Sequence, residues 1–381
     1  MTFIIKIINF ILNAIYLLFK FFRRRKQITL ISRESNNITT DFKLLSEELK
    51  KELPDYKIVV LCKKMDNKLL YAFHMLKQMY HISRSKVVIL DTYCYLISNL
   101  KHKKDLVVIQ IWHAIGICKK AGYAIVGKDE GRSEKVSKSA NMHKNYTYVY
   151  TTSKECIPFM AQVFNCDKSI IRSVPLPRID LLKDKKYINS VKNKIYKKYP
   201  SLKNKINVLY APTFRNSDSI SCYDLDYNRL HEALVKRFSG DWVILVRYHF
   251  RLKNTKIPKK YENTVINVTN YPDMQELLCV TDFGITDYSS WICDYVITKR
   301  PGFLYTTDIE KYIDTERGFY HTLDYYPFPI CKNNDELYNK IINFDDKKYL
   351  KDVNSFLRKV NCYEKGDASK KVVDKMNKLI K

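Results

Sequence analysis

Short runs of apolar residues, separated by longer amphipathic stretches, dominate the chain from residue 28 onward. Apolar runs bounded by polar residues are typical of strands that are buried on both faces. In the first half the strand candidates are 28–32, 57–62, 86–91, 106–111 and 147–151, and helical patterns cover 41–52, 66–80 and 154–164. Strands that alternate with helices predict a parallel sheet covered on both sides.

This pattern is interrupted around 183–205, where the sequence is rich in Lys and Asn and contains Pro200, which predicts a solvated helix and a linker. It then restarts, with strand candidates at 207–210, 242–247, 265–268, 283–286 and 303–305 and a helical end. A chain of 381 residues is long enough for two ordinary cores. We therefore predict an α/β protein with domains at 27–190 and 205–345 and a helical segment at 346–381, whose last helix could cross back.

The segment 1–26 has a pattern of its own. Residues 3–22 are mostly Ile, Leu and Phe, four basic residues follow at 23–26, and one helical stripe carries Lys6, Asn9, Asn13 and Lys20. A spanning helix needs about 20 apolar residues, and a secretory signal carries its charge before the apolar core. We predict a helix in the membrane interface, with its basic end on anionic headgroups. A single span that keeps the body in the cytoplasm is the alternative, and a buried core helix is disfavoured by the basic run.

Charge indicates the kind of partner. Lys and Arg number 67 against 40 Asp and Glu, which gives a formal net charge of +27 and predicts an anionic partner such as a phosphorylated substrate or an acidic membrane. The lysines are spread out, without the aromatic interleaving of a nucleic-acid module, so we expect no nucleic acid. Ten scattered cysteines without a CxxC pair favour a reducing compartment and argue against structural zinc. Neither GxGxxG nor a Walker loop is present, so side chains and helix ends must hold any phosphate.

Polar clusters follow the predicted strands at their carboxyl ends, where parallel sheets bind ligands. They are Trp112 and His113 after 106–111, Thr213 and Arg215 after 207–210, His249 after 242–247, and Asp287, Ser289 and Ser290 after 283–286. The two serines open a predicted helix, so they could bind a phosphate there or only cap the helix. Either histidine could also be a satisfied structural residue.

Six motifs carry a family resemblance. They are QIWHAIGICKKAGY (110–123), HKNYTYVYTTS (143–153), PLPRIDLL (175–182), LYAPTFR (209–215), ITDYSSWICDY (285–295), and RPGFLYTTDIEKY with ERGFY (300–312, 316–320). In this order the chain resembles the CDP-glycerol glycerophosphotransferases, the teichoic-acid primases and polymerases and their capsule-synthesis relatives. The resemblance covers about 28–337. It implies a GT-B fold, in which two Rossmann-like domains face a cleft: the first on the acceptor side, the second binding the CDP-activated donor.

The resemblance also implies the reaction and its residues. An alditol phosphate would pass from CDP-glycerol or CDP-ribitol to a hydroxyl of an undecaprenyl-pyrophosphate-linked acceptor, at the cytoplasmic face of the cell membrane. His113 would be the general base. His249 would act with it, and the donor would be bound by Thr213, Arg215, Asp287, Ser289, Ser290 and Arg317. No metal and no cofactor are expected.

The sequence departs from the family pattern at two places. Ala114 stands where WHG has Gly, an alternative found within the family, and Phe250 replaces the Pro of the usual His-Pro, which removes a fixed backbone angle after His249. Arg178 and Asp180 in PLPRIDLL could form a hinge ion pair or contact the acceptor. Two rival functions stay open: a nucleotide-sugar glycosyltransferase of the same fold, and a non-catalytic membrane-surface protein of a cell-wall assembly complex.

Overall fold

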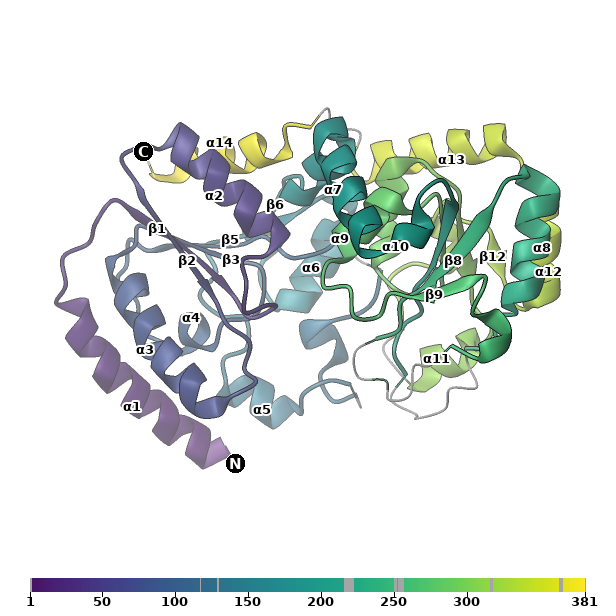
Figure 1. Ribbon diagram of the computed structural model, residues 1–381. Coiled ribbons are helices and arrows are strands. Elements are labelled where there is room, and N and C mark those ends of the chain that lie inside the picture. Colours follow the sequence, from purple (N-terminus) through teal and green to yellow (C-terminus); the bar gives the residue numbers. More distant parts are fainter. Residues whose placement is uncertain are drawn as a thin grey trace. The chain divides into compact units, whose positions relative to one another are not determined.

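The computed structural model describes residues 2–116, 118–128, 130–215, 223–249, 252, 257–315, 318–362 and 366–380. The chain forms two compact units: unit 1 is Met1–Asp180 with Asp367–Lys381, and unit 2 is Leu181–Gly366. Each unit contains one six-stranded sheet with only parallel pairs (Figure 1). The predicted α/β class with two Rossmann-like sheets is confirmed.

Unit 1 has its strands in the order β2-β1-β3-β4-β5-β6. They are β1 (Gln27–Ser32), β2 (Lys57–Cys62), β3 (Val87–Leu90), β4 (Val107–Gln110), β5 (Tyr148–Thr151) and β6 (Ile171–Ser173). The helices are α1 (Thr2–Lys20), α2 (Thr40–Glu52), α3 (Lys68–Arg84), α4 (Tyr95–Asn99), α5 (Glu134–Ser139), α6 (Ile157–Phe164) and α14 (Ala368–Ile380).

The core of unit 1 explains why the last helix belongs to it. Alternate residues of β1, Ile28 and Leu30, face Phe42 of α2 and Val372 of α14 in one buried cluster. Residues of opposite parity face the other side of the sheet, where the Gln27 side chain donates to the His81 carbonyl of α3 at 3.1 Å. Helices therefore cover both faces of the sheet, as the fully buried strands β1 and β3 require.

Unit 2 has its strands in the order β12-β11-β10-β7-β8-β9. They are β7 (Ile206–Tyr210), β8 (Trp242–Val246), β9 (Val265–Asn267), β10 (Phe283–Thr286), β11 (Gly302–Tyr305) and β12 (Ile330–Cys331). The helices are α7 (Lys185–Lys198), α8 (Tyr227–Phe238), α9 (Met274–Val280), α10 (Trp291–Tyr295), α11 (Ile309–Thr315), α12 (Asn334–Ile342) and α13 (Asp346–Lys359). The strand order reverses between β7 and β10, and such a switch point opens a crevice at the carboxyl ends of the strands.

The division of the chain differs in detail from the sequence-based expectation. The structure divides it after Asp180, and α7, the solvated helix expected within 183–205, belongs to unit 2. Only Val191 and Ile195 of α7 are buried, so most of its surface is polar and resembles a solvated segment. At the other end α13 stays in unit 2, and α14 returns to unit 1.

Candidate active site

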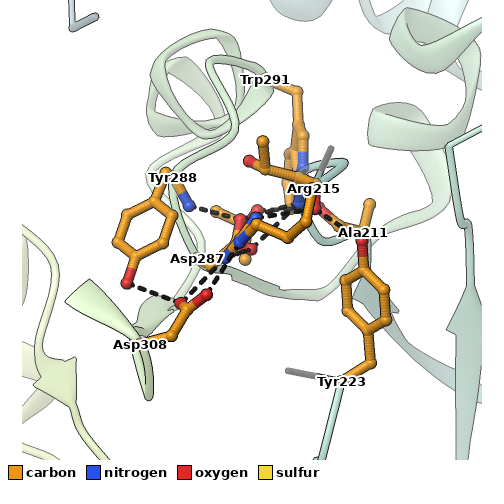
Figure 2. Close-up of polar contacts among 9 residues, drawn as sticks. Ala211, Arg215, Tyr223, Asp287, Tyr288, Trp291 and Asp308 are labelled. Carbon is orange, nitrogen blue, oxygen red and sulfur yellow. Dashed lines mark hydrogen bonds and ion pairs between the residues drawn. The ribbon is translucent and has the colours of Figure 1, made fainter. Parts of the chain in front are cut away.

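Three of the residues expected on the donor side, Thr213, Arg215 and Asp287, lie together at the switch point between β7 and β10. Arg215 lies in the segment after β7, and Asp287 directly follows β10. The Arg215 guanidinium donates to Asp287 Oδ2 at 2.8 Å and to both Asp308 oxygens at 2.9 and 3.0 Å (Figure 2). Asp287 also accepts from the Thr213 backbone N–H at 2.8 Å. One buried cation and two carboxylates thus connect three strand ends.

Aromatic rings complete this cluster. The Arg215 guanidinium lies 5.0 Å from the Tyr288 ring centre and 4.7 Å from that of Tyr312, and the two rings stack at 4.3 Å. The Tyr288 hydroxyl donates to Asp308 at 3.1 Å, which Figure 2 also shows. Burial by itself would raise the pKa of Asp308, but the hydrogen bonds and charge of Arg215 outweigh it and lower that pKa.

The Arg215 side chain is therefore enclosed by protein groups and is not exposed to a ligand. Its side chain is 5% exposed, and Nε, Nη1 and Nη2 all donate to protein acceptors. A guanidinium with these bonds holds the loop that carries Thr213, and few of its N–H groups remain to bind a ligand. Asp308 was not among the sequence candidates. It follows closely after β11, so the selection of polar residues at the carboxyl ends of strands could have included it.

Ser289 and Ser290 lie beside this cluster and are accessible. Ser289 is partly buried and Ser290 is exposed. Gly284 in β10 allows α10 to pack close, since a Cβ there would meet the Tyr295 ring at 2.8 Å. Ser290 occupies the N-cap of α10 but makes no side-chain hydrogen bond to the helix. Capping therefore does not explain the Ser290 hydroxyl, and a helix of only five residues adds little dipole field.

His249 follows β8, at the same edge of the sheet. Its ring is partly buried and lies 5.1 Å from the ring of Phe214, between centres. Its carbonyl accepts from the Leu252 N–H at 3.0 Å. Phe250, the substitution for proline, lies outside the described residues, as does Arg317.

In unit 1, His113 follows β4 on a strained backbone. Trp112, directly before it, has φ of +63°, a region that bulky residues rarely adopt. The Trp112 N–H donates to the Gln110 side chain at 2.9 Å, and the Trp112 and His113 rings lie 4.2 Å apart, between centres. Strain of this kind persists only where the surroundings fix it, and it often marks a functional site.

The hydrogen bond of His113 defines its tautomer. Nδ1 lies 3.1 Å from the Asp91 carbonyl oxygen, which can only accept, so Nδ1 carries the proton. Nε2 is then the nitrogen with the free lone pair in the neutral ring. The ring is exposed, yet desolvation by the protein around it lowers the pKa of His113, while the charge of Glu34 acts in the opposite direction. A neutral imidazole near pH 7 can accept a proton.

Two carboxylates that sequence analysis did not select lie close to His113. Asp91 directly follows β3, and burial raises its pKa to about 7; its Oδ2 accepts from the Thr39 hydroxyl at 3.1 Å. Asp41, 1% exposed, pairs with Arg178, whose N–H and Nε donate to it at 2.9 Å. Arg178 is thereby engaged within unit 1.

Asp180 has a separate structural role. Its carboxylate accepts from the Ala368 and Ser369 N–H groups at 2.8 and 2.9 Å, which caps the start of α14. A hinge ion pair between Arg178 and Asp180, one of the two alternatives that the sequence left open, is absent from the described contacts. Arg178 pairs with Asp41, and Asp180 accepts from two backbone N–H groups of α14.

No group of three or more His, Cys, Asp or Glu side chains placed to hold a metal ion occurs among the described residues. The described arrangement thus offers a histidine that can accept a proton in unit 1, and hydroxyls at the carboxyl ends of the strands in unit 2.

Comparison with known proteins gives the family. The family model described as CDP-Glycerol:Poly(glycerophosphate) glycerophosphotransferase matches residues 14–378. The teichoic acid ribitol-phosphate primase of Bacillus spizizenii is 30% identical over 98% of this chain and 97% of its own length. The teichoic acid glycerol-phosphate primase of Bacillus subtilis is 27% identical over 97% of both chains.

A solved structure agrees with the fold. A histidine variant of the wall teichoic acid polymerase TagF, soaked with CDPG, has a TM-score of 0.77 and 23% identity, and the match covers 100% of this chain and 98% of that one. At this identity the likeness supports the fold alone. The family resemblance expected from the sequence is confirmed, and the chain belongs to the CDP-glycerol:poly(glycerophosphate) glycerophosphotransferase family.

Proposed function

We propose that the protein transfers glycerol phosphate from CDP-glycerol to a hydroxyl of a lipid-linked acceptor in teichoic-acid synthesis. The acceptor is of the undecaprenyl-pyrophosphate-linked kind, so the enzyme acts at the cytoplasmic face of the cell membrane. The observation that carries the proposal, in a chain of this family, is the His113 tautomer: its Nδ1–H is bound to the Asp91 carbonyl, which leaves Nε2 as a base.

The reaction follows from that base. The acceptor hydroxyl gives its proton to Nε2 of His113 as its oxygen attacks the phosphorus next to the glycerol. A new phosphodiester bond forms, the bond to the inner phosphate breaks, and CMP leaves with the electron pair. The protonated imidazole later loses its proton to solvent. General-base catalysis of this kind contributes roughly a hundred- to ten-thousandfold in rate.

Unit 2 binds the donor in this proposal. The Ser289 and Ser290 hydroxyls donate to the pyrophosphate, and His249 stabilises the charge that develops on the leaving CMP. Thr213 and Asp287 shape the same crevice, and Arg215 holds them in place through the contacts with Asp287 and Asp308. Arg317 remains a candidate second cation.

CDP-ribitol is a second candidate donor. The B. spizizenii relative that matches 97% of its own length is a ribitol-phosphate primase, whereas the B. subtilis relative of similar coverage is a glycerol-phosphate primase. The direct experiment incubates the protein with each CDP-alditol and a panel of lipid-linked acceptors, and measures CMP release and product length. Nucleotide-sugar turnover without CMP release from either CDP-alditol would reject the proposal, and so would a protein with no turnover.

A histidine series tests the mechanism. His113→Ala should lower the turnover number by two or more orders of magnitude and leave CDP-alditol affinity nearly unchanged, because the base acts on the acceptor. His249→Ala should weaken donor binding as well. The combined effect should be smaller than the product, since both residues serve one transition state. His231→Ala on α8 is a matched control. A folded His113→Ala enzyme with a near-normal rate would exclude His113 from the mechanism.

A further inference from the structure

Arg247 of unit 2 is a cation at a strand end to which neither the sequence analysis nor the reaction above gives a role. It directly follows β8, and its N–H donates to the Tyr210 carbonyl of β7 at 2.9 Å. Val246, Tyr210 and Ile285 lie in register across β8, β7 and β10. Arg247 therefore comes one position beyond this row, at the carboxyl edge of the sheet.

The Arg247 side chain lies on the face of the sheet that α10 covers. Trp242 of β8 and Phe283 of β10 both contact Phe238 of α8, which defines the opposite face. Gly284 faces away from α8, since a Cβ there would meet a ring of α10 at 2.8 Å. Successive residues of a strand point to opposite faces, so Arg247, an odd number of positions after Trp242, shares the face of Gly284.

The Arg247 guanidinium has few partners. Nη2 donates to the Tyr271 carbonyl at 3.3 Å, while Nε is buried and has no hydrogen-bond partner among the described residues. Burial lowers the pKa of Arg247, and the charge of Asp273 offsets only part of that effect. The Asp273 carboxylate accepts from the Gln275 N–H at 2.8 Å and thus caps the start of α9. The charge of Arg247 is therefore incompletely compensated.

Arg215, in the segment after the neighbouring strand β7, shows the contrast. Its Nε, Nη1 and Nη2 all donate to protein acceptors, and the carboxylates of Asp287 and Asp308 balance its charge. Arg247 carries the same charge with one long hydrogen bond. Burying a charge without compensation costs free energy of folding. Proteins accept such a cost at functional sites, where a ligand supplies the missing charge.

The position of Arg247 relative to the two serines defines which ligand would fit. One strand, β7, separates β8 from β10. Neighbouring strands are roughly 4.8 Å apart, so the ends of β8 and β10 lie about 10 Å from each other. Ser289 and Ser290 follow β10 and precede α10, on the face that Arg247 shares. A nucleoside pyrophosphate is long enough to contact the serines and the arginine with different phosphates.

We propose that Arg247 binds the inner phosphate of the donor, which leaves as CMP, while Ser289 and Ser290 bind the outer phosphate. The inference rests on the proposed CDP-alditol donor and adds a residue to its site. Each phosphate of the donor carries one negative charge. When the bond between them breaks, the inner phosphate keeps the electron pair and its charge rises to two. A fixed cation beside it therefore stabilises the transition state more than the bound donor.

Titration of Arg247→Met with CMP and with cytidine tests the contact, because these ligands differ only in the phosphate. The affinity for CMP should fall by at least about tenfold, as expected for one charge-assisted contact, and the affinity for cytidine should stay the same. Arg237→Met is the matched control. Arg237 lies in the last turn of α8, directly before β8 begins, so this variant removes the same charge from the opposite edge of the sheet and should bind CMP normally. Equal losses for CMP and cytidine, or an unchanged CMP affinity, would overturn the proposal.

Thermal melting without ligand separates a ligand-binding arginine from a structural one. Arg247→Met should melt at or above the temperature of the parent, because it removes a charge that the protein compensates incompletely. If the variant melted early and its folded fraction bound CMP normally, Arg247 would be structural and the proposal would be wrong.

Inorganic pyrophosphate keeps this inference separate from the proposed reaction. It should raise the melting temperature of the parent and of Arg237→Met, and raise that of Arg247→Met by less, whatever group the natural donor transfers. A parent that released no CMP from either CDP-alditol would reject the proposed function and leave this difference in place. Equal stabilisation of the parent and Arg247→Met by pyrophosphate would overturn the role of Arg247 and leave the reaction intact.

Discussion

Replacing Arg215 by methionine distinguishes a structural arginine from one that binds the donor. The substitution keeps most of the side-chain length but removes the charge that pairs with Asp287 and Asp308. Asp287 is 7% exposed and Asp308 is 19% exposed, so both carboxylates would stay largely buried without a cation. Water can replace the lost interactions only if the loops after β7, β10 and β11 open.

The expected loss follows from these exposures. Breaking a buried ion pair by removing one partner costs about 3–5 kcal/mol, because a charge stays buried without compensation. In a unit of this size each kcal/mol lowers the melting temperature by about 2–4 °C, so the transition of unit 2 should fall by roughly 6–20 °C. Adding Asp308→Asn should recover part of that loss, since one uncompensated charge disappears.

Calorimetry and donor titration on the same preparations decide the question. The structural interpretation predicts that Arg215→Met melts early and that Arg215→Met with Asp308→Asn melts later than the single variant. If Arg215 instead binds the donor directly, Arg215→Met should melt near the parent temperature and lose CDP-alditol affinity. That second result would refute the reasoning from burial and hydrogen bonding.

Three further expectations concern other parts of the chain. Ser289→Ala with Ser290→Ala should weaken CDP-alditol binding, by about 1–3 kcal/mol for each charge-assisted bond, and change the melting temperature little; an unchanged donor titration would remove both hydroxyls from the site. The pKa of Asp91 is raised in the folded state to about 7, above its ordinary 3.8, so the folded protein binds more protons between those values and loses stability as pH rises through them. Asp91→Asn should flatten that dependence in unfolding measured from pH 4 to 8, and a parallel curve for parent and variant would contradict the burial argument. Asp180→Ala should expose α14 to proteolysis, with a cost of about 0.5–2 kcal/mol for the lost cap, whereas undiminished protection would show that α14 is held by its apolar face alone.

The strands that sequence analysis predicted are those that can be recognised from the apolar character of their own side chains. Continuous apolar runs such as Trp242–Val246 are buried throughout and require no knowledge of their neighbours. Sequence analysis missed the edge strands β6 (Ile171–Ser173) and β12 (Ile330–Cys331), which have no apolar run of their own and are defined by pairing with β5 and β11. Local pattern thus predicts strands that carry an apolar run, including the short edge strand β9 (Val265–Asn267), and misses edge strands without one.

The candidate site likewise contains residues that sequence analysis found and partners that it missed. Strand ends located His113 and Asp287 in the sequence, since the rule needs only the order of elements along the chain. Sequence analysis did not find the groups to which these residues bind, because the groups are distant along the chain: Asp308 is 93 positions from Arg215, and the Asp91 carbonyl is 22 positions from His113. Which acceptor a side chain reaches depends on how distant strands pack side by side. Sequence could therefore name the residues of the crevice but could not separate a ligand contact from a structural ion pair.

The return of the chain to unit 1 has a consequence for biosynthesis. Val372, Val373 and Met376 of α14 belong to the buried cluster that also contains Ile28 of β1. At ribosomal rates of about 5–20 residues per second, roughly ten to forty seconds separate the synthesis of Asp180 from that of α14. During this interval the apolar side of α2 has no cover from α14, whereas unit 2 is a continuous segment that can fold as it emerges. The second unit to be synthesised is therefore the first whose core can close, and nascent unit 1 is the part of the chain that would need a chaperone.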